Sequence, residues 1–372
     1  MCKWSKIKIK YYNPVEVIET NNWQVDCKNF QQKLGIQNPL VVTSNGNMKR
    51  QNLSSVFNSQ SIFSDVGPDP TFETCQLAID FSIKFDFDGV IAIGGGSVMD
   101  TAKVIMASRG TGINNLIRLL TIKPSYNYSV SSIFIPTTHG TGSEVTMWGT
   151  IWDMQGKNKY SVSHPKLYPS VAILDGSLLL SLPLDISIIT VMDALSHSFE
   201  AIWNNNRNDT SITYAIDAIT MIFANVEELK KHPYDLEIRN NLLRASNKAG
   251  LAFSNTKTAA SHSISYPLTI NYGIPHGIAS SLCLIPLLEL NKKLIYDSLE
   301  KLCEKSSSTY NQLIKKIESI PNGVFTYRLR GWGIKEYQID ELVEQSFSNE
   351  RMENNIKSLS KKDVKRIFLK IF

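Results

Sequence analysis

The sequence predicts an α/β half with a parallel sheet, followed by an all-helical half. Short β-branched runs alternate with helical patterns in the first half, whereas long helical patterns with few strand signals begin at Leu184. The change falls at Pro183, so we expect an α/β domain at residues 1–183 and a helical domain at residues 184–372. A chain of 372 residues is also long for a single hydrophobic core.

Three apolar runs in the first half are predicted strands, at residues 39–44, 89–95 and 132–138. Each is rich in β-branched residues and ends in small or polar residues. Helical spacing occurs between them, at residues 71–86 and 97–108. Strand, helix and strand in repetition indicate a parallel sheet that is covered by helices on both faces.

The second half contains three long patterns with helical spacing, at residues 185–203, 210–231 and 237–255. Each is longer than a typical strand and carries an apolar face, so we expect helices that pack on one another.

The composition is that of a soluble globular protein. Hydrophobic residues make up 42% of the chain and charged residues 20%, which excludes wholesale disorder. The net charge of +5 is too mild to indicate a nucleic-acid partner, although it suits an anionic ligand. The five cysteines are scattered and never in C-x-x-C spacing, and no run of about 18 apolar residues occurs. We therefore expect a cytoplasmic protein without membrane association, disulfides or a thiolate zinc site.

A glycine-rich turn ends the second predicted strand. Gly94, Gly95 and Gly96 come directly before a helix, where backbone N–H groups can close around an anion and the helix N-terminus adds partial positive charge. Ser97 can cap this helix or donate to a phosphate oxygen. The turn predicts a phosphate cradle, with a tight turn lacking any ligand as the alternative, since the pattern is neither G-x-G-x-x-G nor a P-loop.

Further polar residues lie close to this turn. Asp100 and Lys103 follow on the first turns of the helix, where Lys103 is either surface decoration or paired with Asp100. A second polar strand end, at residues 135–146, supplies hydroxyl and backbone donors where open α/β sheets bind ligands. Two such loops on one sheet favour a dinucleotide.

Four residues of the helical half form a candidate metal-ligand set. Asp193 and His197 lie four apart in an apolar stretch and project from one face of a helix, while His262 and His276 follow in similar surroundings. Individually, an ion pair or a satisfied core histidine explains each of them. Together, one carboxylate and three imidazoles suit Fe²⁺ or Zn²⁺, which ligand type does not separate. Such a metal can polarise a carbonyl group.

With these motifs the chain resembles the iron-containing (group III) alcohol dehydrogenases. The matching stretches are GGGSVMDTAK (94–103), PTTHGTGSEVT (136–146), DALSHSFEA (193–201) and SHSISYPLTINYGIPHG (261–277). The resemblance covers nearly the whole chain. It implies a Rossmann-like N-terminal domain and a helical C-terminal domain, an architecture shared with dehydroquinate synthase. It also implies a cleft for NAD(P)H and Fe²⁺, with Zn²⁺ as the alternative metal, and we expect a homodimer.

Carried over residue by residue, the resemblance implies roles in the site. The implied metal ligands are Asp193, His197, His262 and His276. The implied cofactor contacts are Gly94, Gly95, Gly96, Ser97, Asp100, Thr137, Thr138, Ser143 and Lys159, the last near the nicotinamide ribose.

Two positions depart from the family pattern. Tyr266 stands where the family usually has the second histidine of H-x-x-x-H, so proton relay falls to Tyr266, to water or to the ribose hydroxyls. Ser44 stands in the cofactor site where many NAD-preferring members carry an aspartate. Loss of that carboxylate removes repulsion against a 2′-phosphate, which Lys49 or Arg50 would attract, so we expect NADPH to be tolerated.

Residues 146–175, together with SYPLT at 265–269, resemble the phosphonoacetaldehyde reductase (hydroxyethylphosphonate dehydrogenase) branch. The implied reaction is hydride transfer from NAD(P)H to phosphonoacetaldehyde, which gives 2-hydroxyethylphosphonate. A phosphonate needs cationic or hydroxyl donors. The candidates, which are otherwise solvated loop residues, are Lys157, Lys159, Ser161, His164 and Arg207.

Three other functions remain open. The first is a general short-chain alcohol dehydrogenase for butanol- or propanediol-type substrates. The second is a lyase resembling 3-dehydroquinate synthase, against which the PTTHGTGSE loop argues. The third is a noncatalytic metal- or nucleotide-binding scaffold, which the intact four-ligand set disfavours.

Overall fold

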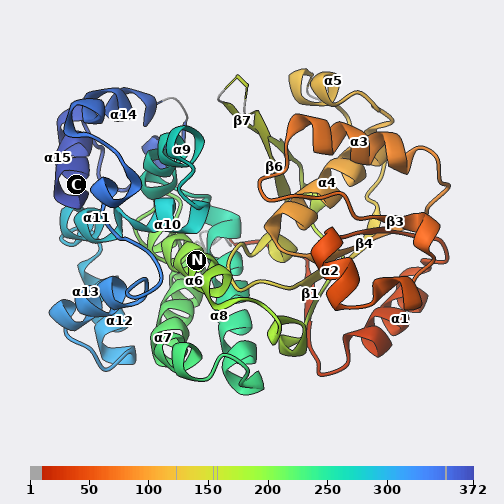
Figure 1. Ribbon diagram of the computed structural model, residues 1–372, viewed down its shortest axis with the longest axis horizontal. Coiled ribbons are helices and arrows are strands. Elements are labelled where there is room, and N and C mark those ends of the chain that lie inside the picture. The colour runs from red at the N-terminus through yellow and green to blue at the C-terminus, as the bar shows by residue number, and fades with distance from the viewer. Residues whose placement is uncertain (1–10, 123, 154, 157, 348–349) are drawn as a thin grey trace, which may run out of the picture.

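A six-stranded parallel sheet forms the centre of the N-terminal half (Figure 1). The computed structural model describes the chain from residue 11 onward, except residues 123, 154, 157 and 348–349. In spatial order the strands are β1 (Glu16–Glu19), β8 (Val171–Leu174), β5 (Ser131–Pro136), β4 (Gly89–Gly94), β2 (Pro39–Val42) and β3 (Ile62–Phe63). The three predicted strands are confirmed as β2, β4 and β5, which lie side by side.

Helices cover both faces of this sheet. They are α1 (Trp23–Leu34), α2 (Asn45–Arg50), α3 (Phe72–Ser82), α4 (Gly96–Thr111) and α5 (Leu116–Thr121). Along β4, Val90 and Ala92 pack in the core with α3 and α4, whereas Ile91 and Ile93 pack in the core with α1. Successive strand residues point to opposite faces, so a strand that is buried on both faces is continuously apolar.

The second half consists of helices around one apolar core (Figure 1). The helices are α6 (Leu184–Ile202), α7 (Asp209–Lys231), α8 (Leu236–Thr256), α9 (Ala260–Tyr272), α10 (His276–Ser281), α11 (Leu284–Asn291), α12 (Tyr296–Lys305), α13 (Tyr310–Ser319), α14 (Ile339–Gln345) and α15 (Lys361–Ile371). Helix α6 begins directly after Pro183, and it is the central helix, since every residue from Val191 to Ile202 is buried. The three long predicted helices are confirmed as α6, α7 and α8, and the domain boundary stays a prediction.

A β-hairpin that the sequence did not reveal lies beside α4. Its strands β6 (Trp148–Asp153) and β7 (Asn158–Ser163) are antiparallel and place Trp152 opposite Lys159. Both residues line a cleft between the two halves of the molecule. The hairpin therefore brings a cation from a peripheral strand into the site.

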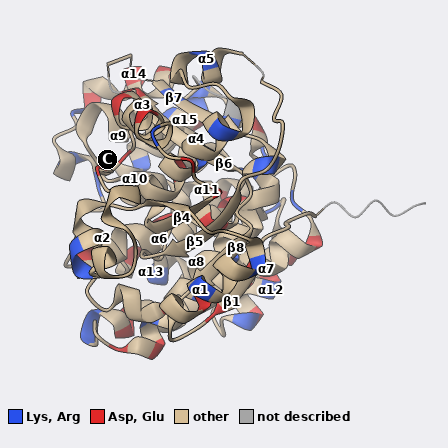
Figure 2. Cartoon of the chain, turned by 90° about the vertical axis from the view of Figure 1, so that its right-hand side faces the viewer, with Lys and Arg blue, Asp and Glu red and all other residues tan. Residues whose placement is uncertain are grey.

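The surface carries charges of both signs. On the side shown in Figure 2, basic and acidic residues are interspersed. Within the described ranges, no helix has the length and apolar character that a membrane span requires.

Candidate active site

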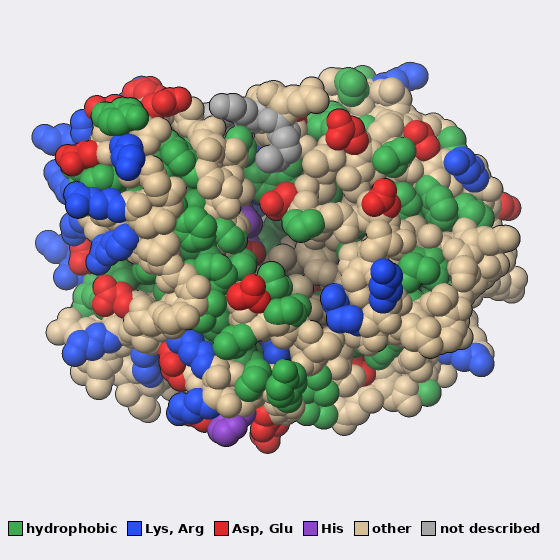
Figure 3. Space-filling view, viewed as in Figure 1, with side chains coloured by type: hydrophobic (Ala, Val, Ile, Leu, Met, Phe, Trp, Pro, Cys, Tyr) green, Lys and Arg blue, Asp and Glu red, His purple; other side chains and the backbone are tan. Residues whose placement is uncertain are grey.

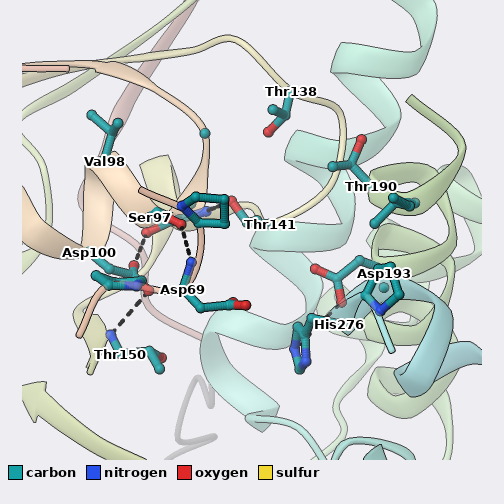
Figure 4. A pocket seen from close by; sticks show the side chains of 18 of the residues that line it. Asp69, Ser97, Val98, Asp100, Thr138, Thr141, Thr150, Thr190, Asp193 and His276 are labelled. Atoms are coloured by element: carbon teal, nitrogen blue, oxygen red, sulfur yellow. Dashed lines mark hydrogen bonds and ion pairs between the residues drawn. The ribbon is translucent and has the colours of Figure 1, made fainter. Parts of the chain in front are cut away.

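A cleft of about 700 Å³ lies where the two halves meet. Figure 3 shows the molecule hollowed at this place. The α/β half contributes the glycine turn, with Gly95 and Gly96, and the helical half contributes Asp193, His262 and His276. Figure 4 shows Ser97 and Asp100 on one side of the cleft and Asp193 and His276 on the other.

Asp193, His262 and His276 converge from three different helices. Their ligand atoms all lie within 4.8 Å of one another. Asp193 Oδ1 is 3.5 Å from His262 Nε2 and 4.0 Å from His276 Nε2. Among the described residues, the buried Nε2 of His262 has no hydrogen-bond partner. An unpartnered buried nitrogen beside a carboxylate fits a divalent cation, and no other part of the described chain holds such a cluster.

The protonation states of Asp193 and His276 suit ligation, whereas that of His262 does not. Burial alone would raise the pKa of Asp193, but the nearby imidazoles of His197, His276 and His262 outweigh burial and lower it. Burial, followed by the positive charge of Lys159, lowers the pKa of His276 well below its usual range. Asp193 and His276 therefore offer an ionised carboxylate and a neutral imidazole, which are the forms that bind metals. Burial would lower the pKa of His262, but the carboxylates of Glu200 and Asp193 outweigh burial and raise it, so a metal at this nitrogen would displace a proton.

His197 lies beside the cluster rather than within it. Its ring stacks between Phe253, at 4.0 Å, and His262, at 4.6 Å between ring centroids. Its Nδ1 is 3.9 Å from Asp193 Oδ2. The structure thus brings together three of the four predicted ligands, and ligation by His197 stays a prediction.

Glu200 is a functional residue that the sequence reasoning missed. This fully buried carboxylate accepts from the backbone N–H of His262 at 3.0 Å and contacts His262 Nδ1 at 2.6 Å. The pair fixes the imidazole so that its other nitrogen faces Asp193. Glu200 lies seven residues after Asp193 and three after His197, so its place on the same helical face was a usable signal.

The glycine turn is shaped by the loop that follows β5. Gly95 caps α4 without any side-chain hydrogen bond, so the possible capping role of Ser97 is wrong. Instead, the Ser97 hydroxyl accepts from the backbone N–H of Asp69 at 3.1 Å. A Cβ on Gly96 would lie 2.6 Å from Thr141 Cγ2, so only glycine permits this close approach. The predicted cofactor contact Thr138 lies beside Gly95, where an added Cβ would be 3.0 Å from Thr138 Cγ2.

Lys103 is buried, so its interpretation as surface decoration is wrong. Its ammonium donates to Ser143 O and Oγ, Thr146 Oγ1 and Trp148 O, at 2.7 to 2.9 Å. Asp100 accepts instead from Ser143 Oγ at 2.8 Å. It also accepts from the Thr150 N–H at 3.1 Å (Figure 4). Burial lowers the pKa of Lys103 to about 8 and raises that of Asp100. The group ties α4 to the loop after β5.

Ser44 lines the same cleft. It caps α2 by accepting from the Asn47 N–H at 3.2 Å, and Asn47 donates to Thr137 Oγ1 at 3.1 Å. Arg50 donates to Asn47 Oδ1 at 2.8 Å and also lines the cleft, whereas Lys49 does not. Of the two cations predicted to attract a 2′-phosphate, Arg50 is therefore the one that is placed to do so.

Lys159 lies over two aromatic rings near the metal cluster. Its Nζ is 4.6 Å from the ring centroid of Trp152 and 4.3 Å from that of Tyr266. Burial, followed by the charge of Arg351, lowers the pKa of Lys159 to about 7. Arg351 also lines the cleft and is the second functional residue that the sequence reasoning missed.

Tyr266 is buried behind the residues that line the cleft. Its hydroxyl hydrogen-bonds to Arg351, and burial raises its pKa to about 12. A role for Tyr266 in proton relay stays a prediction.

Most of the predicted phosphonate contacts lie elsewhere. Lys157 is outside the described residues. Ser161, His164 and Arg207 do not line the cleft. His164 stacks on Tyr126 and accepts from a backbone N–H, and Arg207 donates to a backbone carbonyl. Only Lys159 reaches the site, so the other described candidates are wrong.

A glycine turn at a sheet edge and an Asp–His cluster, facing each other across one cleft, define a protein that binds a nucleotide and a metal. Comparison with known families makes this specific. The chain belongs to the iron-containing alcohol dehydrogenase family, because the model of that family matches residues 14–176 and the model of its C-terminal region matches residues 187–372.

Named relatives are alcohol dehydrogenases. The chain is 33% identical to 1-propanol dehydrogenase PduQ of Salmonella typhimurium over 273 residues, 70% of each chain. It is 28% identical to NADPH-dependent butanol dehydrogenase of Clostridium saccharobutylicum over 318 residues, 82% of this chain and 81% of that protein. It spans only 27% of the aldehyde-alcohol dehydrogenase of Streptococcus pneumoniae, with 33% identity over 240 residues.

Solved structures confirm the fold that the resemblance implied. The sulfoacetaldehyde reductase of Bifidobacterium kashiwanohense, in complex with NAD⁺, superposes with a TM-score of 0.89 at 25% identity. The match covers 97% of this chain and 98% of that one. A 1,3-propanediol oxidoreductase superposes with the same TM-score at 24% identity, covering 97% and 99% of the two chains.

Proposed function

We propose that this protein uses NAD(P)H to reduce phosphonoacetaldehyde to 2-hydroxyethylphosphonate, with iron held by the cluster of Asp193, His262 and His276 and by the neighbouring His197. The observation that carries the proposal is that this cluster and the glycine turn line one cleft. A carbonyl at the cluster and a dinucleotide at the sheet edge would share that cleft, which is the proximity that hydride transfer requires. Iron bound there would act as a Lewis acid on the carbonyl.

The chain's own residues have distinct tasks in this proposal. The cradle of Gly95 and Gly96 holds the pyrophosphate, and Glu200 keeps His262 aimed at the metal. Water or a ribose hydroxyl supplies the proton, because Tyr266 is recessed behind the cleft wall with its pKa raised to about 12.

Positive charge supports a substrate with an anionic tail. Lys159 and Arg351 both line the cleft. Lys159 contacts the ring of Trp152, and the same ring contacts His276. The similar sulfoacetaldehyde reductase is named for an aldehyde of this kind, a short chain that ends in a sulfonate.

A second candidate is a general dehydrogenase for neutral short-chain alcohols. The butanol and 1-propanol dehydrogenases among the relatives favour it. So do the apolar side chains of Ile186, Ile189 and Phe253 along the cleft.

A substrate panel separates the two candidates. Protein reconstituted with Fe²⁺ or Zn²⁺ is assayed for NADH and NADPH oxidation with phosphonoacetaldehyde, sulfoacetaldehyde and butanal. We expect the highest kcat/KM for phosphonoacetaldehyde. A higher value for butanal supports the second candidate, and no oxidation with any aldehyde overturns both.

The proposal includes a cytoplasmic homodimer. Sedimentation equilibrium of the purified protein tests the dimer, and fractionation of cells tests the location.

A further inference from the structure

Arg351 reaches the cleft from a short 3-10 helix, η8 (Glu350–Asn354), far along the chain from the other site residues. Its Nη1 donates to Thr258 Oγ1 at 3.1 Å and to the hydroxyl of Tyr266. Its guanidinium carbon is 5.4 Å from the centroid of the Tyr266 ring. Thr258 also lines the cleft. Thr258 and Tyr266 therefore help to hold the arginine in place while it lines the cavity.

The ring of Tyr266 supports three residues of the cleft at once. Lys159 Nζ lies 4.3 Å from its centroid, and Arg351 lies over the same ring. The ring also stacks on His276, with centroids 6.2 Å apart and planes inclined by 7°. Lys159 and Arg351 therefore contact the same aromatic ring as His276, which is a predicted metal ligand. A substrate that spans the metal cluster and these cations needs only a short chain between its two ends.

The two cations influence each other. The charge of Arg351 is the second cause, after burial, of the lowered pKa of Lys159. Three carboxylates, Asp100, Asp69 and Asp193, act in the opposite direction without reversing the shift. Like charges in a partly desolvated cleft repel, so an anion between them would be stabilised by both.

We propose that Arg351, Thr258 and Lys159 form the subsite that binds the oxyanion tail of the substrate, and that Tyr266 is a positioning residue for Arg351. This inference rests on the proposed function, which it deepens by assigning residues to the tail. A guanidinium presents parallel N–H donors that match two oxygens of a phosphonate or a sulfonate. The Thr258 oxygen accepts from Arg351, which leaves its own proton for a third oxygen.

Substrate discrimination in Arg351→Gln tests the subsite. On metal-reconstituted protein, the ratio of kcat/KM for phosphonoacetaldehyde to that for butanal should fall by about 30-fold or more, chiefly through KM. Sulfoacetaldehyde, as a second arm, shows whether any tetrahedral oxyanion is bound or only a phosphonate. Arg351→Lys keeps the charge but loses the paired N–H donors of the guanidinium, so its ratio should lie between those of the wild type and Arg351→Gln. Arg207→Gln is the matched control, because Arg207 lies outside the cleft and should keep the wild-type ratio.

Tyr266→Phe separates positioning from proton relay. Loss of the hydroxyl frees Arg351 and should raise KM for phosphonoacetaldehyde about 3- to 10-fold with little loss of kcat. A relay would show the reverse, a large fall in kcat. That result overturns the positioning role.

Calorimetry with ethylphosphonate, an unreactive probe, measures the subsite without turnover. Its affinity for metal- and NAD⁺-loaded protein should fall at least 30-fold in Arg351→Gln, with wild-type circular dichroism as the check on folding. If the wild type reduces phosphonoacetaldehyde while Arg351→Gln and Arg351→Lys keep both ratio and affinity, the subsite is wrong and the proposed function stands. If the wild type reduces no aldehyde but binds ethylphosphonate through Arg351, the proposed function is wrong and the subsite stands.

Discussion

Two buried acids on one helix have different tasks at the candidate metal site. Asp193 faces the imidazoles of His262 and His276 and can ligate a cation. Glu200, two turns further along α6, contacts the opposite nitrogen of His262. A carboxylate behind a ligating imidazole fixes the orientation of the ring and increases its basicity. Metal affinity is therefore set by both acids, although only one can touch the metal.

Glu200→Gln is expected to lower the affinity for Fe²⁺ or Zn²⁺ by about 10- to 100-fold, because the charged acceptor for His262 is lost. Calorimetric titration of chelator-treated protein with Fe²⁺ or Zn²⁺ measures this affinity. Glu144→Gln changes another buried acid, which contacts Asn247 and does not line the cleft, and should keep the affinity. Equal losses in both variants would contradict a specific role for Glu200.

Ser44→Asp is expected to shift cofactor preference towards NADH by about 10-fold or more in the ratio of kcat/KM values. A carboxylate at this position would repel a 2′-phosphate and accept from the ribose hydroxyls. Steady-state kinetics with both cofactors measure the shift. Lys49→Asp serves as the control, because Lys49 does not line the cleft. A similar shift in this variant would mean that the change in cofactor preference comes from long-range charge alone.

At the scale of elements, one loop joins the two halves of the site. The segment after β5 packs Thr141 against the glycine turn, is held to α4 by Lys103, and contacts α8 through Gly142 and Gly250. Gly142 has φ of +56°, and a Cβ there would lie 2.3 Å from the Gly250 Cα. The distance between the cofactor side and the metal side therefore depends on this close backbone contact.

Gly142→Ala is expected to destabilise the protein by about 2 kcal/mol or more, because it combines an unfavourable φ with a backbone clash. Denaturant-induced unfolding of wild type and variant measures the change. Gly67→Ala is the matched control, since Gly67 has no positive φ and nothing within 4 Å of its added Cβ. A Gly142→Ala variant as stable as Gly67→Ala would contradict the tight contact.

At the scale of the whole molecule, a buried cation ties the helical half to the segments beside it. Arg239 of α8 donates to Ser187 Oγ at 2.6 Å, to Leu182 O at 2.9 Å and to Pro233 O at 2.9 Å. Its Nη1 also lies 3.4 Å from Nε2 of the buried His139, in the loop after β5. Burial, followed by the charge of Arg239, lowers the pKa of His139 from 6.5 to about 3.

This histidine makes the protein acid-sensitive. His139 stays neutral in the folded state, whereas the unfolded chain takes up its proton below about pH 6.5. Its contribution to stability is thus complete above that pH and is lost as the pH falls towards about 3, by up to about 1.4 kcal/mol per pH unit. His139→Asn should flatten the pH dependence of the unfolding free energy by about that slope. His232→Asn, at an exposed position, should keep the wild-type slope.

Local patterns were sufficient for three of the four inner strands and for the long helices, whereas the inner strand β8 was not predicted. The apolar runs of β2, β4 and β5 and the helical period of α6, α7 and α8 are properties of consecutive residues, as is the glycine turn. The short edge strands β1 and β3 were not predicted, because a run of two to four residues carries little periodicity. The hairpin of β6 and β7 was not predicted either.

The types of the candidate metal ligands were determined by the sequence, but their convergence was decided by tertiary structure. Asp193, His262 and His276 come from three helices, whose packing brings their ligand atoms within 4.8 Å of one another and leaves His197 stacked to one side. Arg351 reaches the same cleft from a segment that no motif marks, while Ser161, His164 and Arg207 do not. Spacing along a chain encodes contacts within one helix or strand, whereas contacts between distant segments depend on how whole elements pack.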